Sequence, residues 1–292
     1  MHTINLTMGK TITNENWTTV IKPKSGWFDI HLRELWRYRD LIMLFVKRDF
    51  TAVYKQTILG PLWFIIQPLF STLVFTVIFG RVAKIPTDGI PHVLFYLAGI
   101  VMWNYFSSSL SKTSDTFYAN AGMFGKVYFP RLSVPISVVI TNLITFAIQF
   151  AVFLFLLAYY YLQGMAFSVH WTAVLLPLLI VQMAALGLGT GIIVSSLTTR
   201  YRDFVYVVSF GVQLWMYASP VVYPLSQVPG KWRAIYLINP MASVIETFKF
   251  MFIGAGGVSV YEYGIGLGVT AVLLFAGIVL FSRTEKTFMD TI

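Results

Sequence analysis

Six segments of the chain carry no Lys, Arg, Asp or Glu over a length that can cross a lipid bilayer as a helix. The hydrocarbon core is about 30 Å thick, so a spanning helix needs roughly 20 apolar residues. Hydrophobic residues make up 57% of the chain and charged residues only 11%, which argues against a soluble globular protein. We therefore predict an all-α integral membrane protein with six transmembrane helices. The predicted spans are about residues 61–80, 90–111, 132–161, 171–197, 204–222 and 263–282.

Basic residues are distributed unevenly around these segments. Sixteen of the 21 Lys and Arg residues lie before the first span, between spans two and three, between spans four and five, or after the last span. Cytoplasmic loops of membrane proteins carry such an excess of positive charge. We therefore predict that both termini are cytoplasmic, which agrees with an even number of spans. The same rule accounts for the net charge of +9, so we expect no nucleic acid partner.

Residues 29–57 precede the first span and combine an apolar stripe with basic flanks. Apolar residues from Leu32 to Val53 recur at helical spacing, and basic residues lie mostly between them. A helix of this kind suits the headgroup layer of a membrane. We predict a cytoplasmic amphipathic interface segment. A helix packed on a soluble partner is the alternative, and the two are compatible if a partner lies beneath it.

The segment between spans five and six lies on the outer side but is not a polar loop. It contains two apolar pieces, about 229–238 and 241–253, separated by the turn signal Asn239-Pro240. Each piece is too short to cross, and helices of this length are often re-entrant or interfacial. We predict two short re-entrant helices that form an outer gate; surface helices without a gating role are the alternative. The gate residues would be Pro220, Tyr223, Trp232, Tyr236, Asn239 and Pro240.

Two GxxxG motifs lie inside predicted spans, at Gly187/Gly191 and Gly264/Gly268. Small residues at this spacing let two membrane helices approach closely. We expect helix packing at both motifs and no nucleotide loop at either.

The sequence lacks the common catalytic and cofactor motifs. A phosphate-binding loop is absent, because the sequence before Gly9-Lys10-Thr11 has Ile4 where the first glycine belongs. There is no cysteine, and the four histidines are isolated, so we expect no metal site and no cofactor on this chain. No predicted span contains a carboxylate, and no pair of carboxylates falls in a predicted cleft. We therefore expect a permease and not an enzyme, with any energy supplied by a partner.

Aromatic and polar residues share helical faces in three of the spans. Such uncharged stripes suit a sugar channel, because aromatic faces stack on sugar rings and hydroxyl or amide groups meet sugar hydroxyls. Packing or an interfacial aromatic belt is the alternative. The candidate channel residues are Tyr206, Phe210, Gln213 and Tyr217 in span five, Phe64, Gln67, Ser71 and Phe75 in span one, and Trp103 and Phe106 in span two.

Five motifs in order resemble one known family. They are RDFTAVYKQTILGPLWFIIQPLF at 48–70, TTRYRDF at 198–204, SPVVYP at 219–224, YLINPMASVIETFK at 236–249 and EKTFMD at 285–290. Together they resemble the permease subunit of type-2 ABC exporters of polysaccharides, with the O-antigen and teichoic-acid export permeases nearest. The resemblance makes residues 58–292 the six-span transmembrane domain and leaves residues 1–28 as a variable extension.

The resemblance implies an assembly in the bacterial cytoplasmic (inner) membrane. Two copies of this chain would form a homodimer above two copies of a cytoplasmic ABC ATPase, which would carry the ATP and Mg²⁺. Residues 29–39 would form the interface helix among the membrane lipids. The 112–131 loop would contain the helix that touches the ATPase, and residues 229–253 would be the outer gate helices.

The implied substrate is a glycan on a polyprenyl pyrophosphate lipid, which calls for cations on the inner side. The candidate capture site consists of Lys47, Arg48, Lys126, Arg131, Arg200 and Arg202. Setting the topology and binding anionic lipid are alternative roles for each of these cations. Alternative functions are export of teichoic acid or capsule, export of a small molecule or drug by the same fold, and a membrane enzyme such as a lipid-sugar transferase, for which we find no catalytic constellation.

Overall fold

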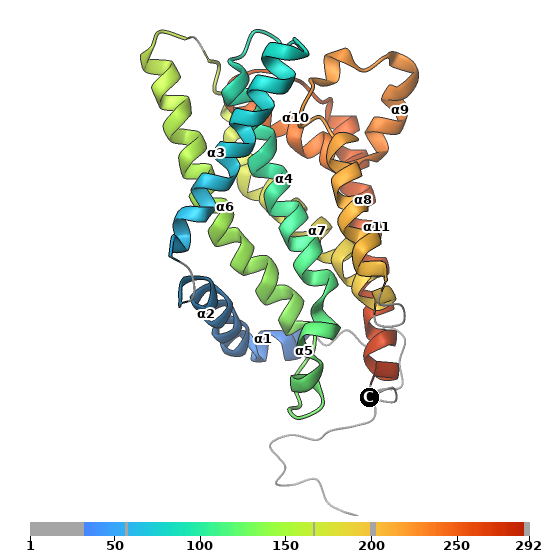
Figure 1. Cartoon of the computed structure of the whole chain (residues 1–292). Coiled ribbons are helices and arrows are strands. Elements are labelled where there is room, and N and C mark those ends of the chain that lie inside the picture. Colours follow the sequence, from blue (N-terminus) through green and yellow to red (C-terminus); the bar gives the residue numbers. More distant parts are fainter. Residues whose placement is uncertain (1–31, 56–57, 166, 199–202, 289–292) are drawn as a thin grey trace, which may run out of the picture.

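The computed structural model describes residues 32–55, 58–165, 167–198 and 203–288, and the regular elements in these ranges are all helical (Figure 1). The α-helices are α1 Leu32–Arg37, α2 Arg39–Lys55, α3 Trp63–Phe75, α4 His92–Ser114, α5 Thr116–Phe124, α6 Ser133–Leu162, α7 Leu176–Thr198, α8 Phe204–Tyr217, α9 Gly230–Ile238, α10 Pro240–Ile253 and α11 Val260–Phe288. Short 3-10 turns lie at Gly60–Leu62, Trp171–Leu175 and Leu225–Gln227, and a π-helix, η2, covers Thr76–Val82.

Five helical runs are long and apolar enough to cross a membrane. They are Gly60–Val82, His92–Ser114, Ser133–Leu162, Trp171–Thr198 and Val260–Glu285. These runs coincide with five of the six predicted spans, and they make the chain a multi-pass membrane protein.

The remaining predicted span, at 204–222, is only partly helical. α8 ends at Tyr217, so its 14 residues extend about 21 Å at 1.5 Å per residue, less than the hydrocarbon core. The helix stops where Pro220 follows, because proline lacks the amide hydrogen that a helix needs. Ser219 and Pro220 instead begin a buried turn. The count of six spans therefore stays a prediction.

The core of the bundle is built around α4, which contacts α3, α6, α7, α8 and α10. Most of its side chains from Leu94 to Leu110 are buried. Small residues on α7 allow the close approach, since a Cβ added at Gly187 would lie 2.8 Å from Ser109, and one at Gly191 would lie 2.6 Å from Thr113. The first GxxxG motif therefore packs as predicted.

The second GxxxG motif makes no such contact within the described chain. A Cβ at Gly264 or Gly268 would meet nothing within 4 Å, so these glycines do not lie in a helix contact within the chain. Gly266 and Gly277 of α11 make the close contacts instead, with Ser243 and with the backbone of Gly189.

α1, α2 and α5, which were predicted to be cytoplasmic, lie together at the lower end of the bundle in Figure 1, and α2 contacts α6 there. The apolar side chains of α2 fall into two groups, one buried and one exposed. Ile42, Phe45 and Val46 are buried against the bundle, whereas Met43 and Leu44 are exposed. The described part of the predicted interface segment is thus helical and amphipathic, and α5 supplies the helix predicted within 112–131.

Candidate functional site

The predicted stripe on α8 lies on the surface of the described chain. Tyr206 is 80% exposed, Phe210 63% and Tyr217 46%, and Gln213 is also exposed. The opposite side of α8 is anchored by Trp215, whose ring packs on Phe106 at 4.9 Å between centroids. One face of α8 therefore holds the helix to the bundle, and the other presents aromatic and amide groups outward.

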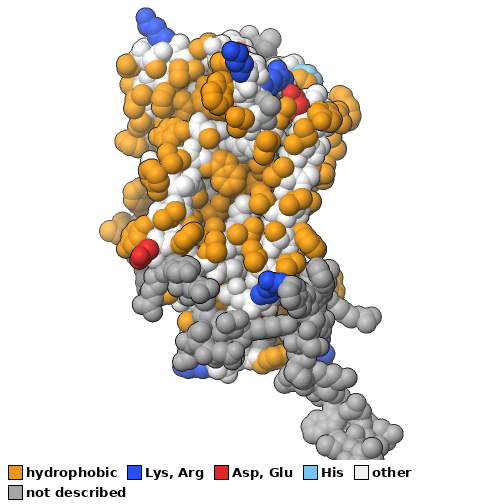
Figure 2. All heavy atoms as spheres, turned by 90° about the vertical axis from the view of Figure 1, so that its right-hand side faces the viewer, with side chains coloured by type: hydrophobic (Ala, Val, Ile, Leu, Met, Phe, Trp, Pro, Cys, Tyr) orange, Lys and Arg blue, Asp and Glu red, His pale blue; other side chains and the backbone are white. Residues whose placement is uncertain are grey.

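Hydrophobic side chains dominate the surface on the α8 side of the molecule (Figure 2). In this view the Lys, Arg, Asp and Glu side chains lie toward the two ends, and the middle is uncharged. Such a surface suits lipid or a second apolar protein surface and is unsuited to bulk water.

The other two stripes are placed differently. On α3, Gln67 is exposed while Phe64 and Ser71 are half-buried. Phe75 packs edge-on against Phe79 at 5.3 Å and Tyr96 at 6.2 Å. Trp103 and Phe106 of α4 are buried inside the bundle, with centroids 5.4 Å apart. The structure thus does not bring the α4 pair onto the surface that carries the α8 stripe.

The predicted outer gate is organised by Asn239, which joins α9 to α10. Its side-chain oxygen caps α10 by accepting from the Met241 amide at 3.1 Å, and it also accepts from Trp215 Nε1 at 2.9 Å. Its amide nitrogen donates to Ala218 O at 3.1 Å and to Ser219 Oγ at 2.9 Å. One side chain therefore ties the start of α10 to the end of α8, and Pro240 is buried behind it.

The aromatic members of the predicted gate surround an open groove. Tyr223 donates its hydroxyl to Tyr217 O at 3.0 Å and packs against Tyr236 at 6.0 Å. Trp232 is exposed at its rim. The groove has a volume of about 550 Å³, and the η2–α4 loop forms its other wall through Lys84 and Ile85.

A buried charge pair on α10 was missed by sequence reasoning. Lys249 is fully buried, donates to Pro220 O at 2.6 Å, lies 3.5 Å from the centre of the Phe95 ring and is 3.7 Å from the Glu246 carboxylate. Burial lowers the pKa of Lys249 to about 8, against the opposing effect of Glu246. Lys249 thus fixes the turn after α8 to α10. The signal was present in the sequence as two opposite charges three residues apart within an otherwise apolar helix.

Glu246 also overturns the statement that no two carboxylates share a cleft. Burial raises the pKa of Glu246, and the nearby Asp88 carboxylate raises it further, while Lys249 lowers it. Asp88 and Glu246 line one cavity, although they lie more than 150 residues apart in the sequence. Their proximity depends on the packing of the η2–α4 loop over α10, which no local pattern indicates.

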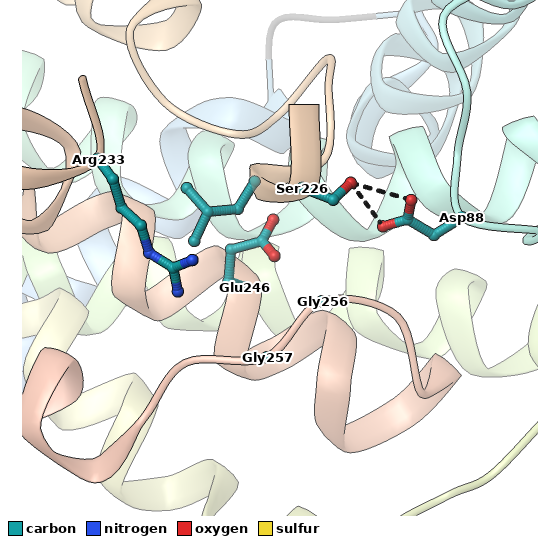
Figure 3. Close-up of a pocket in the computed structure, with 7 residues that line it drawn as sticks. Asp88, Ser226, Arg233, Glu246, Gly256 and Gly257 are labelled. Atoms are coloured by element: carbon teal, nitrogen blue, oxygen red, sulfur yellow. Dashed lines mark hydrogen bonds between the residues drawn. The ribbon is translucent and has the colours of Figure 1, made fainter. Parts of the chain in front are cut away.

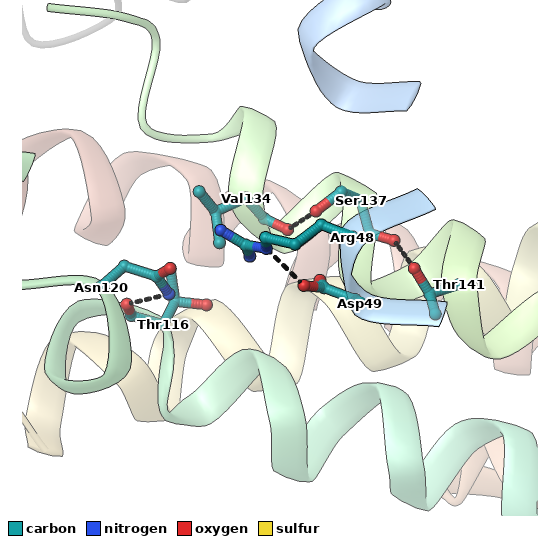
Figure 4. Close-up of polar contacts among 7 residues, drawn as sticks. All are labelled: Arg48, Asp49, Thr116, Asn120, Val134, Ser137 and Thr141. Atoms are coloured by element: carbon teal, nitrogen blue, oxygen red, sulfur yellow. Dashed lines mark hydrogen bonds and ion pairs between the residues drawn. The ribbon is translucent and has the colours of Figure 1, made fainter. Parts of the chain in front are cut away.

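Four of the six cations predicted to capture the pyrophosphate lie among the described residues: Lys47, Arg48, Lys126 and Arg131. Lys47, Arg48 and Lys126 are exposed. Arg48 pairs with its neighbour Asp49 at 2.8 Å and lies beside α6, with its head toward Val134 (Figure 4). Arg200 and Arg202 lie outside the described residues.

Arg131 differs from Lys47, Arg48 and Lys126 because it is buried. It donates to the backbone oxygen of Glu285 at 2.6 Å and lies over the Phe124 ring at 5.5 Å. Arg131 and Lys126 line a cavity of about 280 Å³ together with Glu285. The contacts of Arg131 join the α5–α6 loop to the end of α11.

Comparison with known proteins identifies the family. Residues 40–253 match the family described as ABC-2 type transporter. The chain belongs to this family. It is 29% identical to an O-antigen export system permease protein of Klebsiella pneumoniae over 252 residues, which cover 86% of this chain and 94% of that protein. A Myxococcus xanthus protein with the same description is 29% identical over 274 residues, covering 89% and 98%. The polysialic acid transport protein of Escherichia coli is 25% identical over 248 residues, covering 84% and 93%.

No group of three or more His, Cys, Asp or Glu side chains suited to a metal ion occurs among the described residues. The family membership makes the chain a membrane transport subunit. Its described residues offer apolar surfaces, exposed aromatic side chains and a few buried charges.

Proposed function

We propose that this chain is the transmembrane subunit of an ATP-driven ABC exporter that moves a lipid-linked cell-surface polysaccharide out of the bacterial cytoplasm. The observation that carries the proposal is the exposed aromatic and amide face of α8 in a family member whose near-full-length relatives are described as O-antigen export permeases. The similarity to a polysialic acid transport protein makes capsule export the nearest alternative.

In the proposed assembly, two copies of the chain pair so that their α8 faces line a shared path. Pairing removes exposed Tyr206, Phe210 and Tyr217 from lipid, and the open surroundings of Gly211 leave room along the same helix. An uncharged aromatic path lets a glycan slide, because stacking on a ring face has no single strong binding point. α8 and the turn to Pro224 together form the sixth crossing, with both termini in the cytoplasm.

Energy for transport comes from a separate ATPase that binds ATP and Mg²⁺ beneath the cytoplasmic elements. α5 and the exposed end of α2 are the surfaces available to that partner. Lys47, Arg48 and Lys126 are the cations that meet the lipid pyrophosphate, whereas Arg131 acts first as a structural link between α6 and α11, because it is buried on Glu285. α9 and α10 form the outer gate of the path.

The proposal is tested by deleting the gene and measuring lipid-linked polysaccharide on each side of the inner membrane. We expect the polymer to accumulate in the cytoplasm and to reach the surface again when the wild-type chain is restored. Normal surface polysaccharide in the deletion strain would refute the proposal. ATP hydrolysis by the purified chain without a partner would refute the division of labour.

A further inference from the structure

A polar cavity opens at the outer end of the molecule, separate from the α8 stripe (Figure 3). Its volume is about 270 Å³. It is lined by residues of five segments: Asp88, Leu225, Ser226, Arg233, Glu246, Gly256 and Gly257. Four of these side chains are charged or hydroxylated, which contrasts with the hydrophobic surface of the bundle.

The walls of the cavity are fixed by their own polar contacts. Ser226 Oγ donates to both carboxylate oxygens of Asp88, at 3.0 and 3.3 Å. Opposite them, Arg233 is half-exposed and donates through Nε and Nη2 to one oxygen of Glu262, at 3.2 and 3.0 Å. The cavity is therefore a preformed site with an acceptor wall and a donor wall.

Glu246 forms the floor between these walls, as Figure 3 shows. It has 0% of its side chain exposed, and neither carboxylate oxygen has a hydrogen-bond partner in the described protein. The Lys249 ammonium, 3.7 Å away, is occupied by Pro220 O. Both carboxylate oxygens are covered, and Lys249 and the Leu225 backbone lie near enough to lower the pKa of Glu246 against the effect of burial, so Glu246 acts on the cavity through its charge and not by direct contact with a ligand.

The mixture of charges selects the kind of ligand. A divalent cation prefers several oxygen ligands, but Arg233 lines the same cavity and only two carboxylates face it. An anion is disfavoured by Asp88 and Glu246. A neutral polyhydroxy ligand fits best, because its hydroxyls can donate to Asp88 and to the Ser226 oxygen and can accept from Arg233. Gly257 leaves one wall open, since an added Cβ there would meet nothing within 4 Å, whereas Gly256 lies against the Glu246 carboxylate.

We propose that this cavity binds one neutral sugar residue of the emerging glycan at the outer face. The inference rests on the proposed export function, which supplies the sugar. The volume lies near the lower end of ligand pockets, roughly 300 Å³, so the site suits a single ring and not a longer oligosaccharide. Asp88, Ser226 and Arg233 contact the sugar, and Glu246 supplies the negative floor.

The test uses the complex in lipid nanodiscs and the host's own polysaccharide, released from its lipid and cut to single repeating units. Saturation-transfer NMR measures the affinity of these units for wild-type protein, Gly257→Leu and Gly230→Leu. An added Cβ at Gly257 or Gly230 meets nothing within 4 Å, so both variants should fold, but only Gly257 lines the cavity. We expect binding at least tenfold weaker in Gly257→Leu and unchanged in Gly230→Leu.

Asp88→Asn provides a second variant that preserves shape, and we expect severalfold weaker binding from it. Equal affinities in wild type and Gly257→Leu would overturn the sugar site, as would a wild-type protein that binds Ca²⁺ through Asp88 but no sugar. Surface polysaccharide is measured in the same strains. Export that persists without sugar binding refutes this site alone, whereas absence of any export role for the wild-type chain refutes the proposed function.

Discussion

α4 and α8 were both predicted to line a channel, yet they occupy opposite environments. α4 is buried over most of its length, whereas α8 exposes Tyr206, Phe210 and Tyr217. Both helices carry aromatic and polar residues at helical spacing, so the stripe alone does not separate core from surface. The difference lies in the neighbouring helix: Gly187 and Gly191 of α7 close on α4, while nothing in the described chain covers the α8 stripe.

The largest effect should follow from opening the α4–α7 contact. In Gly191→Leu, the new side chain would meet Thr113 and the α4 backbone, and overpacking of this kind costs about 1–3 kcal/mol or more. We expect the amount of protein in the membrane to fall sharply, as measured by immunoblot. Gly211→Leu on α8 is the matched control, since a Cβ there meets nothing within 4 Å. Equal levels of the two variants would contradict the contrast between these helices.

Breaking the buried pair should have the next largest effect. Lys249→Met leaves Glu246 buried without its cation, which costs about 3–5 kcal/mol. We expect a lower thermal midpoint of the purified protein. The double variant Glu246→Leu/Lys249→Met should recover part of the loss, because no buried charge remains. A double variant no more stable than Lys249→Met would show that the pair is not the source of the effect.

Substitutions in the α8 stripe should reduce transport without reducing stability. Tyr217→Ala and Phe210→Ala remove exposed rings, and aromatic contacts are worth about 0.5–1.5 kcal/mol, equivalent to about a two- to tenfold change. We expect a loss of that size in the rate at which polysaccharide reaches the surface, with normal protein levels. If the amount of protein fell together with export in these variants, the α8 stripe would be a packing surface and not a transport path.

The smallest effect should come from an exposed ring away from α8. Phe155 of α6 is 72% exposed and lies on a helix for which no channel role was predicted. We expect Phe155→Ala to change the free energy of unfolding by no more than about 0.5 kcal/mol and to leave export unaltered. If export fell as far as in Phe210→Ala, exposure alone, and not position on α8, would explain the sensitivity.

Five of the spans, the helix before the first span and the two short helices α9 and α10 could be predicted, because each depends on a local pattern of hydropathy and turn residues. The end of α8 at Tyr217 was harder to place, since residues 218–222 are as apolar as a span, and only Pro220 indicates a break. Gly264 and Gly268 show a similar limit, because a motif gives the spacing of small residues but not the partner helix. Within the described chain, the close contact between α11 and α7 is made by Gly277 against Gly189 instead.

The residues of the candidate site also differ in whether a local pattern or tertiary packing brings them together. Tyr206, Phe210, Gln213 and Tyr217 follow from the period of one helix and are found on one exposed side. The cavity between Asp88 and Glu246 could not be predicted, because it requires a loop and a helix far apart in the sequence to meet. Arg131 shows the same limit, since its contact with Glu285 spans the distance from the α5–α6 loop to α11.

The most direct test of the proposed path asks whether the α8 stripe meets water during transport. The chain has no cysteine, so single cysteines can be introduced without background. Phe210→Cys and Phe155→Cys are compared in the complete complex during ATP turnover, with a charged thiol reagent that does not enter lipid. The account predicts rapid labelling at position 210 and none at position 155. Equal protection of both positions would mean that α8 faces lipid or a dry contact, and the path would lie elsewhere.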